Sequence, residues 1–414
     1  MSLATRPGSV LPDRGDPIEL SDEQRAFQQE VREWLMANAP AELKGRRMPR
    51  YRAPKDLKAV LDDWTKRLHD AGYMCVAWPM EYGGRGLSGV EVALLNEEFH
   101  LAQVPRMTRG MGESLVGPSI ILHGTEEQKA HFLPRIIDGT DKYCQGFSEP
   151  NAGSDLAGLR TRGTVRGDEV VVNGQKVWTS WYWDATMLFC LCRTDDSAPK
   201  HKGISYVLIP IHTADGQSNG VEFRPIKQAT GEGHFAETFI TDAKAPLFNV
   251  IGGLNSGWKV AMTTLGNERG GGATTQHTQF EEELRRLVDD ARRLGKLSDP
   301  LVRERLAWAY CNVEILRMSG VQLLNALATG QDPGPAGSAS INKIRWSEYE
   351  RRLLELALDI LGPESLVAGE DYQLSHWQQT FLQTRTHTIW GGTAEIQRNI
   401  IAERVLGLPK EVQA

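Results

Sequence analysis

Residues 142–253 form a run of short strand-like segments that no amphipathic helix interrupts. The segments are rich in Val, Ile, Phe, Trp and Thr, and Gly, Asn, Asp and Pro separate them, as in short β-strands joined by turns. Asn173-Gly174 predicts a hairpin turn between two of these strands. The run therefore predicts an antiparallel barrel or sandwich. The expected strands are residues 143–149, 169–172, 175–180, 187–193, 204–211, 221–226 and 237–241.

Helical patterns precede and follow this run. Capping-box pairs open three of the helices, and residues 300–329 and 339–361 are long enough for an up-and-down bundle. The pairs are Ser21 with Gln24, Ser88 with Glu91, and Thr125 with Gln128. The chain is thus expected to be an α+β protein. Its expected parts are a loose tail at 1–18, a helical domain at 19–141, the β domain at 142–253 and a C-terminal helical bundle at 254–414.

Composition excludes several classes of protein. The formal net charge of -6 offers no basic surface for nucleic acid. No apolar run is long enough to insert into a membrane, and the N-terminus shows no signal-peptide core. The cysteines lie in apolar or strand-like contexts without a CxxC spacing, so we expect a reduced cytoplasmic protein with no metal site. They are Cys75, Cys144, Cys190, Cys192 and Cys311.

Common catalytic and nucleotide-binding motifs are missing or misplaced. The chain has no HExxH, GxSxG or Walker A pattern. Residues 231–236 fit G-x-G-x-x-A, but strand-like residues 238–241 follow them. A dinucleotide fingerprint must open a helix after a strand, so this match is not expected to bind a dinucleotide.

The segment 389–407 begins as a glycine turn and continues as a helix with one apolar face. Thr393 can cap this helix, with Ile396 at the N3 position and Glu395 in the first turn. Gly407 stops it. A turn aimed at a helix start exposes backbone N–H groups and suits an anionic or oxygen-rich ligand. An ordinary packed C-terminal helix explains the same residues equally simply.

The most informative loop is YCQGFSEPNAGSDLAG at residues 143–158. Its small residues let the backbone approach a ligand closely, and Ser148 and Ser154 add hydroxyl groups. On the strand that follows, Trp178 can lie against a flat ring while Ser180 bonds its edge. The alternative is a hairpin with a tryptophan in its core.

Five motifs in this order resemble those of the acyl-CoA dehydrogenase family. They extend from about residue 20 to residue 409, and the resemblance implies a middle β-barrel domain followed by a four-helix bundle. The motifs are AWPMEYGG, YCQGFSEPNAGSDLAG, NGQKVWTS, GGLNSGW followed by ER, and IWGGTAEIQRNIIAERVLG.

The resemblance implies FAD-dependent desaturation of an acyl-CoA thioester between its α and β carbons. A base removes the α-proton, and the β-hydride goes to flavin N5, because no side chain can accept a hydride. Arg292 stands in a segment without the aromatic residue of the family's Arg-x-x-Phe-Gly. The residues that match substrate contacts are Ser154, Arg269, Trp390 and Gly392. The residues that match FAD contacts are Gln145, Phe147, Ser148, Gly153, Ser154, Trp178, Ser180, Arg292, Trp390, Thr393 and Glu395.

The catalytic base has two possible places in proteins similar to this one. Many carry it as a Glu directly before the Gly-Thr of the last motif, where this chain has Gly391. A subset resembling isovaleryl-CoA and long-chain dehydrogenases places it on the helix after GW, and the match here is Glu268. The resemblance therefore implies Glu268 as base and the Gly391 backbone N–H as a donor to the thioester oxygen. The alternative for Glu268 is a solvated helix start beside Arg269.

Substrate, acceptor and assembly are less constrained. The glycines of residues 270–273 would leave room for a bulky acyl group, although a loose helix start explains them equally well. The resemblance also implies an electron-transfer flavoprotein as acceptor and a homotetramer built as a dimer of dimers, with a heterotetramer as the other possibility. Two alternative functions are an acyl-CoA oxidase on the same fold and a non-catalytic partner subunit.

Overall fold

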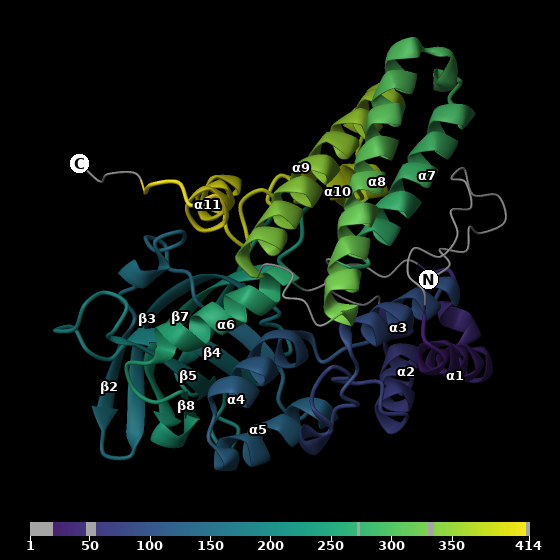
Figure 1. Cartoon of the computed structure of the whole chain (residues 1–414). Coiled ribbons are helices and arrows are strands. Elements are labelled where there is room, and N and C mark those ends of the chain that lie inside the picture. Colours follow the sequence, from purple (N-terminus) through teal and green to yellow (C-terminus); the bar gives the residue numbers. More distant parts are fainter. Residues whose placement is uncertain (1–19, 47–54, 271–273, 330–334, 411–414) are drawn as a thin grey trace. The chain divides into compact units, whose positions relative to one another are not determined.

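The computed structural model describes residues 20–46, 55–270, 274–329 and 335–410. The expected loose tail at 1–18 lies outside these residues. The chain divides into two compact units, which we call the sheet unit and the bundle unit. The sheet unit comprises Asn38–Leu87 and Ala102–Glu268, and the bundle unit comprises Met1–Ala37, Ser88–Leu101 and Arg269–Ala414. Figure 1 labels the elements of both.

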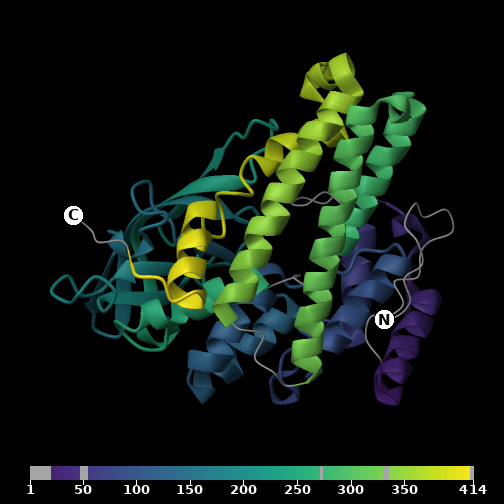
Figure 2. The same ribbon diagram turned by 45° about the horizontal axis from the view of Figure 1, so that its top comes forward.

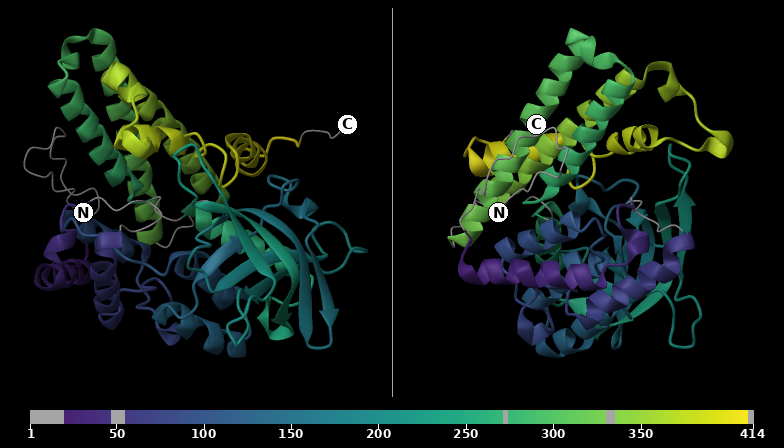
Figure 3. Two further views of the ribbon diagram at one scale, coloured as in Figure 1. Left: turned by 180° about the vertical axis from the view of Figure 1, so that it is seen from behind. Right: turned by 90° about the vertical axis from the view of Figure 1, so that its right-hand side faces the viewer.

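In the described part of the sheet unit, eight strands form one sheet. Most neighbouring strands are antiparallel, but β1 pairs β4 in parallel, which corrects the purely antiparallel expectation. The order is β6-β7-β3-β2-β4-β5-β8, and Figure 3 shows the strands from behind. The bounds are β1 Tyr143–Gly146, β2 Arg162–Arg166, β3 Glu169–Ser180, β4 Met187–Arg193, β5 Ile204–Pro210, β6 Val221–Ile226, β7 Phe235–Pro246 and β8 Val250–Ile251.

The predicted hairpin turn at Asn173-Gly174 is wrong. These residues lie inside the continuous strand β3, at a register shift in its pairing with β7. The turn falls instead at Gly167, which has φ +62 and leads from β2 to β3. Because β2 reads RGTVR and is mostly exposed, it lacked the apolar pattern that marked its neighbours.

Helices complete the sheet unit. Thr125 caps α5 in the predicted capping box. Strand β5 packs closely against the start of α6, since a Cβ on Gly257 would lie 2.3 Å from the Ser205 carbonyl carbon. The segment 231–236 leads into strand β7, which begins at Phe235, rather than into a helix, so a dinucleotide-binding role for it is excluded. The helices of this unit are α2 Lys58–Asp70, α4 Gly117–His123, α5 Glu126–Asp138 and α6 Gly257–Gly270.

Long antiparallel helices build the bundle unit, as the sequence predicts. The helices α8 and α9 run side by side in Figure 2, and Phe280, Leu353 and Ala357 are among the side chains buried between the helices. Ser21 and Ser88 make the predicted capping interactions with Gln24 and Glu91. The helices are α1 Asp22–Asn38, α3 Gly89–Leu101, α7 Gln276–Arg293, α8 Pro300–Ala328, α9 Pro335–Leu361, α10 His376–Thr384 and α11 Ala394–Ile400.

All five cysteines are free thiols. Four are buried in the sheet unit, where burial raises the pKa of each, to about 11 for Cys190. Cys311 is exposed on α8 of the bundle unit. No helix in the described part of the chain combines the length and apolar character that a membrane crossing needs. The described residues also contain no group of His, Cys, Asp and Glu that could hold a metal ion.

The buried Trp78 packs between two glycines that cannot accept a side chain. A Cβ on Gly84 would lie 2.1 Å from the Trp78 carbonyl oxygen, and one on Gly117 would lie 1.9 Å from the indole ring. The indole N–H donates to the Glu113 carbonyl at 3.1 Å. Close packing around one tryptophan therefore explains Gly84 of AWPMEYGG and Gly117 on α4.

We predict that Gly84→Ala lowers the free energy of unfolding by about 2 kcal/mol or more, because the clash is with backbone that cannot move aside. Gly266→Ala is the matched control, since its Cβ would meet nothing within 4 Å on helix α6. That change should raise the free energy of unfolding by about 0.5–1 kcal/mol. Urea unfolding followed by circular dichroism measures both, and equal stability of the two variants would contradict the packing account.

Candidate active site

The loop after β1 presents backbone and small polar groups rather than large side chains. Phe147 is buried, and its ring lies 5.6 Å from that of Phe189 and 6.0 Å from that of Tyr206. Its side chain therefore belongs to the core, and only its backbone can meet a ligand. Gln145 and Ser148 on either side of it are half-buried.

The same loop ends in an open glycine-serine pair. Gly153 and Ser154 are both exposed, and a Cβ on Gly153 would meet nothing within 4 Å. Just before them, Glu149 and Ala152 exchange backbone hydrogen bonds of 3.0 and 3.1 Å, which close a tight turn. A side chain added at Gly153 would therefore meet no described atom, and the backbone at this point is open.

Trp178 lies at an irregularity near the end of β3. The register with β7 shifts between Lys176 and Thr179, and Trp178 takes a positive φ of 64°. Its side chain is 58% exposed, so the alternative of a core tryptophan is excluded. Thr179 points the other way, is fully buried and accepts a 2.7 Å hydrogen bond from Thr238.

The loop and the tryptophan strand meet within the sheet unit. The Val177 backbone N–H donates to the Ser148 carbonyl at 2.9 Å. Ser180 is half-buried, and its hydroxyl contacts the Trp178 carbonyl at 3.5 Å. The groups predicted from the two motifs, Ser148, Trp178 and Ser180, therefore come from adjacent backbone segments.

A buried ion pair that the sequence analysis did not single out lies beneath this meeting point. Lys176 Nζ is 2.9 Å from Glu149 Oε1, and Lys176 is fully buried. Burial alone would raise the pKa of Glu149, but Lys176 and hydrogen bonds from the segment at Thr161 and Arg160 hold it below its ordinary value. Spacing along the chain gives no signal for this pair, because its members stand 27 residues apart.

Glu268 lies near the C-terminal end of helix α6, not at a solvated helix start, which corrects that alternative. The residue one turn earlier, Thr264, is fully buried, and its hydroxyl lies 2.8 Å from that of Ser119 on α4. His123 Nε2 is 2.8 Å from the Thr263 hydroxyl. These two contacts fix the rotation of α6, and Glu268 itself is half-buried.

Two predictions near Glu268 cannot be followed in the structure. The side chain of Arg269 lies outside the described part of the chain, and so does most of the glycine run at 270–273.

Burial lowers the pKa of His123 beside the same helix, and the charge of Lys259 acts in the same direction. The neutral imidazole can then share a single hydrogen bond with Thr263.

In the bundle unit, the glycine turn before α11 has the predicted form. Gly391 and Gly392 have φ of 66° and 91°, values that favour glycine. The buried Gln397 donates from Nε2 to the Gly391 carbonyl at 2.9 Å. Thr393 caps α11 by accepting the Ile396 N–H at 3.2 Å, as predicted.

The remaining predicted residues of the bundle unit differ in surroundings. Trp390 is half-buried, with its ring 5.6 Å from that of Trp346 and 5.5 Å from that of His387. The pKa of Glu395 lies below its ordinary value, because its carboxylate accepts hydrogen bonds from the Glu395 backbone N–H and from the Thr393 hydroxyl. Arg292 is exposed on α7 and pairs with Asp289 at 2.7 Å.

Three models of acyl-CoA dehydrogenase domains match the chain in order. The N-terminal domain matches residues 21–140, the middle domain residues 144–243 and the C-terminal domain residues 255–406. Together they define a three-part oxidoreductase fold that spans nearly the whole chain. Fold and motifs thus agree on one class of protein.

Individual relatives agree with the domain models. The chain is 42% identical to acyl-CoA dehydrogenase IpdE1 of Mycobacterium tuberculosis, over 94% of this chain and 98% of that protein. Among solved structures it resembles the Tcur3481-Tcur3483 steroid ACAD, with 30% identity, a TM-score of 0.77, and coverage of 96% and 100% of the two chains. It also resembles the ChsE4-ChsE5 complex of Mycobacterium tuberculosis, with 27% identity, a TM-score of 0.75, and coverage of 95% and 100%.

The chain belongs to the acyl-CoA dehydrogenase family. It is an acyl-CoA dehydrogenase, and the enzymes of this family are FAD-dependent oxidoreductases. The predicted family, fold class and enzyme class are therefore confirmed.

We predict that Trp178→Gly is more stable to urea than Trp178→Ala by about 1 kcal/mol, because a positive φ is costly for a residue with a Cβ. Both variants remove the same exposed indole, so their difference isolates the backbone conformation. At a position with the negative φ of an ordinary strand, the alanine variant would instead be the more stable of the two. A more stable alanine variant would show that Trp178 does not hold its positive φ in solution.

Proposed function

We propose that this enzyme desaturates an acyl-CoA thioester, with Glu268 removing the α-proton and the Gly391 backbone N–H binding the thioester oxygen. The observation that carries the proposal is the pairing of two features: a glycine with positive φ where many relatives have their acid, and a half-buried glutamate on α6. The contacts of Thr263 and Thr264 hold α6 in one rotation, so the carboxylate of Glu268 has a restricted direction.

The residues of the sheet unit fit a flat cofactor. Trp178 offers an exposed aromatic face, Ser148 and Ser154 offer hydroxyl groups, and the backbone at Gly153 is open. We propose that these residues hold FAD together with Gln145, the Phe147 backbone and Ser180. The family resemblance adds Thr393, Glu395, Trp390 and Arg292 as FAD contacts near a subunit interface, and Ser154, Arg269, Trp390 and Gly392 as contacts to acyl-CoA. Bound FAD would supply the hydride acceptor that no side chain provides.

The protein groups would then act on the thioester in two ways. The Glu268 carboxylate accepts the α-proton, which is too weakly acidic to be lost without help. A hydrogen bond from the Gly391 N–H to the thioester oxygen stabilises the negative charge that develops there. Glycine at position 391 keeps this donor while leaving the space beside it free of a side chain.

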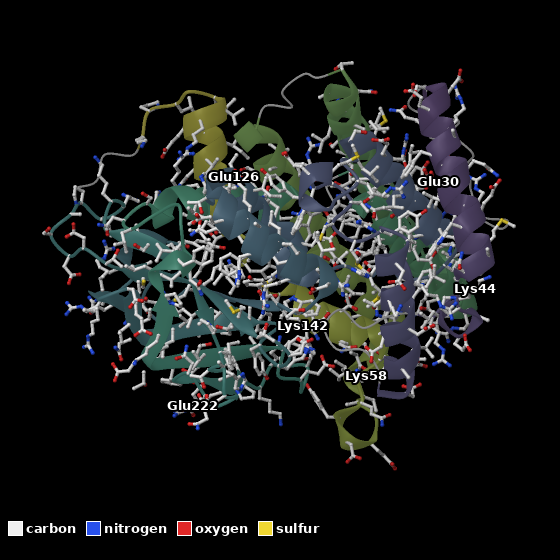
Figure 4. The ribbon with its side chains drawn as sticks, turned by 90° about the horizontal axis from the view of Figure 1, so that it is seen from below. Glu30, Lys44, Lys58, Glu126, Lys142 and Glu222 are labelled. Carbon is white, nitrogen blue, oxygen red and sulfur yellow. The ribbon has the colours of Figure 1, made fainter. Side chains whose placement is uncertain are left out.

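We predict that Glu268→Gln lowers turnover by about 10²–10⁴-fold, because an amide cannot accept the proton. Dye-coupled reduction and anaerobic bleaching of the flavin absorbance measure this step. Glu126→Gln is the control, since Glu126 is an exposed residue of α5 with a side chain 80% accessible (Figure 4). Wild-type turnover in the Glu268 variant would refute the assignment of the base. Peroxide released on addition of substrate in air would indicate an oxidase instead.

We further propose that the acyl group is bulky and ring-bearing, in the manner of a steroid-derived side-chain thioester. The support is the likeness to the solved Tcur3481-Tcur3483 steroid ACAD. The glycine run after Glu268 would leave room for such a group.

A panel of CoA thioesters tests the substrate class. We predict that kcat/KM for a steroid side-chain thioester exceeds that for butyryl-CoA by about 10²-fold or more, because burial of the rings adds binding energy that the short chain lacks. Palmitoyl-CoA separates a preference for rings from a preference for mere length. A butyryl-CoA value above every bulky thioester would contradict the proposal.

We propose that electrons pass to an electron-transfer flavoprotein and that the chain works as part of a tetramer. The solved Tcur3481-Tcur3483 and ChsE4-ChsE5 proteins are each named for two components, which favours testing a heterotetramer beside the expected homotetramer. The mass of the purified chain in solution, alone and with a second subunit of the same fold, separates these assemblies. A chain that binds flavin only together with a second subunit would be one component of a heterotetramer.

A further inference from the structure

Lys176 is the feature of the sheet unit that the proposed chemistry leaves unexplained. Its side chain is fully buried, and so is nearly all of the side chain of Glu149, which is 8% exposed. Lysine and glutamate are rarely buried unless they are paired, because both charges lose their hydration. The Lys176 ammonium group is fully enclosed, so a role in direct chemistry does not account for it.

The Lys176 ammonium group binds two points of the loop after β1. It donates to the Phe147 carbonyl at 3.1 Å and to Glu149 Oε1 at 2.9 Å. These two residues stand on either side of Ser148. The ammonium group therefore fixes the backbone on both sides of the serine that carries a proposed cofactor contact.

Glu149 extends the connection to a third segment. Its Oε2 accepts the Arg160 N–H at 2.7 Å, and its Oε1 accepts the Thr161 N–H at 2.8 Å. Thr161 directly precedes strand β2. One buried carboxylate thus joins the loop, the segment before β2 and, through Lys176, strand β3.

The position of Lys176 on β3 adds a second consequence. Lys176 is the last residue of regular pairing with β7 before the register shift, and Trp178 follows two residues later with its positive φ. Between them, the Val177 N–H bonds to the Ser148 carbonyl at 2.9 Å. The ion pair therefore sets the separation between the loop and the exposed indole.

We infer that Lys176 is a positioning residue, which holds the loop at residues 147–154 and the Trp178 strand in one fixed arrangement through Glu149. This inference rests on the proposed FAD site, because those two segments are its halves. Removal of the ammonium group leaves a buried carboxylate with two backbone donors but no balancing charge, and the loop loses its side-chain link to strand β3. The loop would then open more often without unfolding of the sheet.

The test uses the full-length chain purified with FAD, and four variants: Lys176→Met, Glu149→Gln, the double variant and Arg162→Met. The last is the matched control, since it removes a cation whose ion pair with Asp196 is exposed, 2.7 Å long and in the same unit. Hydrogen–deuterium exchange follows the amides of residues 147–154 and, as reference, those of β5. Titration of the apoprotein with FAD gives the dissociation constant.

For Lys176→Met we expect exchange of the loop amides to rise about tenfold or more while β5 stays unchanged. We expect the FAD dissociation constant to rise about tenfold or more, because the two halves of the site are no longer preorganised. Glu149→Gln should act in the same direction, and the double variant should lose no more than the worse single variant. Arg162→Met should match the wild type.

Unchanged loop exchange in a folded Lys176→Met variant would overturn the inference, as would a uniform rise across β5, which would indicate a general loss of stability. If Lys176→Met does not fold, the loop exchange of Glu149→Gln decides the question in the same way. If the wild-type chain binds no FAD, alone or with a second subunit of the same fold, the proposed cofactor site fails, whereas the exchange measurement still decides whether Lys176 fixes the loop.

Discussion

The arrangement of the sheet unit depends on the pairing of strand β3 with β7. Two opposing demands act on the side chains of β3. Its first half pairs regularly and buries Val170 and Val172 in the core. Its second half must turn one side chain out to solvent without leaving the sheet. The register shift between Lys176 and Thr179 meets both demands, since an extra residue in one strand redirects the side chain and breaks the alternation. The exposed Trp178 is the result.

The bundle unit also contains an irregular stretch of backbone, which is a turn rather than a bulge. The two glycines before α11 adopt positive φ, and a buried glutamine side chain from the following helix binds the carbonyl of the first. The turn before α11 is therefore held by a side chain of α11 itself. In both units, an irregular stretch of backbone is held by a buried polar side chain, and the regular helices and strands around it are ordinary in their packing.

Much of this fold could be predicted from the sequence, because its signals are local. The helix caps at Ser21, Thr125 and Thr393 depend on residues three positions apart, and all three have the predicted bonds. Strand β2 was missed because its exposed, polar residues carry no apolar alternation. Asn173-Gly174 was misread because the same dipeptide can form a hairpin turn or, as here, lie in a strand opposite an extra residue of its partner β7, and only the pairing decides. Lys176 could not be predicted as buried, since its burial depends on a carboxylate distant in the chain.

The distribution of thiols has a practical consequence for spectroscopy. Cys311 is exposed on α8, whereas the other four cysteines are buried and burial raises their pKa values. The thiolate is the form that maleimides attack, so such a reagent should modify the native chain at one position. A fluorophore or nitroxide could therefore be attached to the helical unit without mutagenesis, and its signal would report on the surroundings of α8.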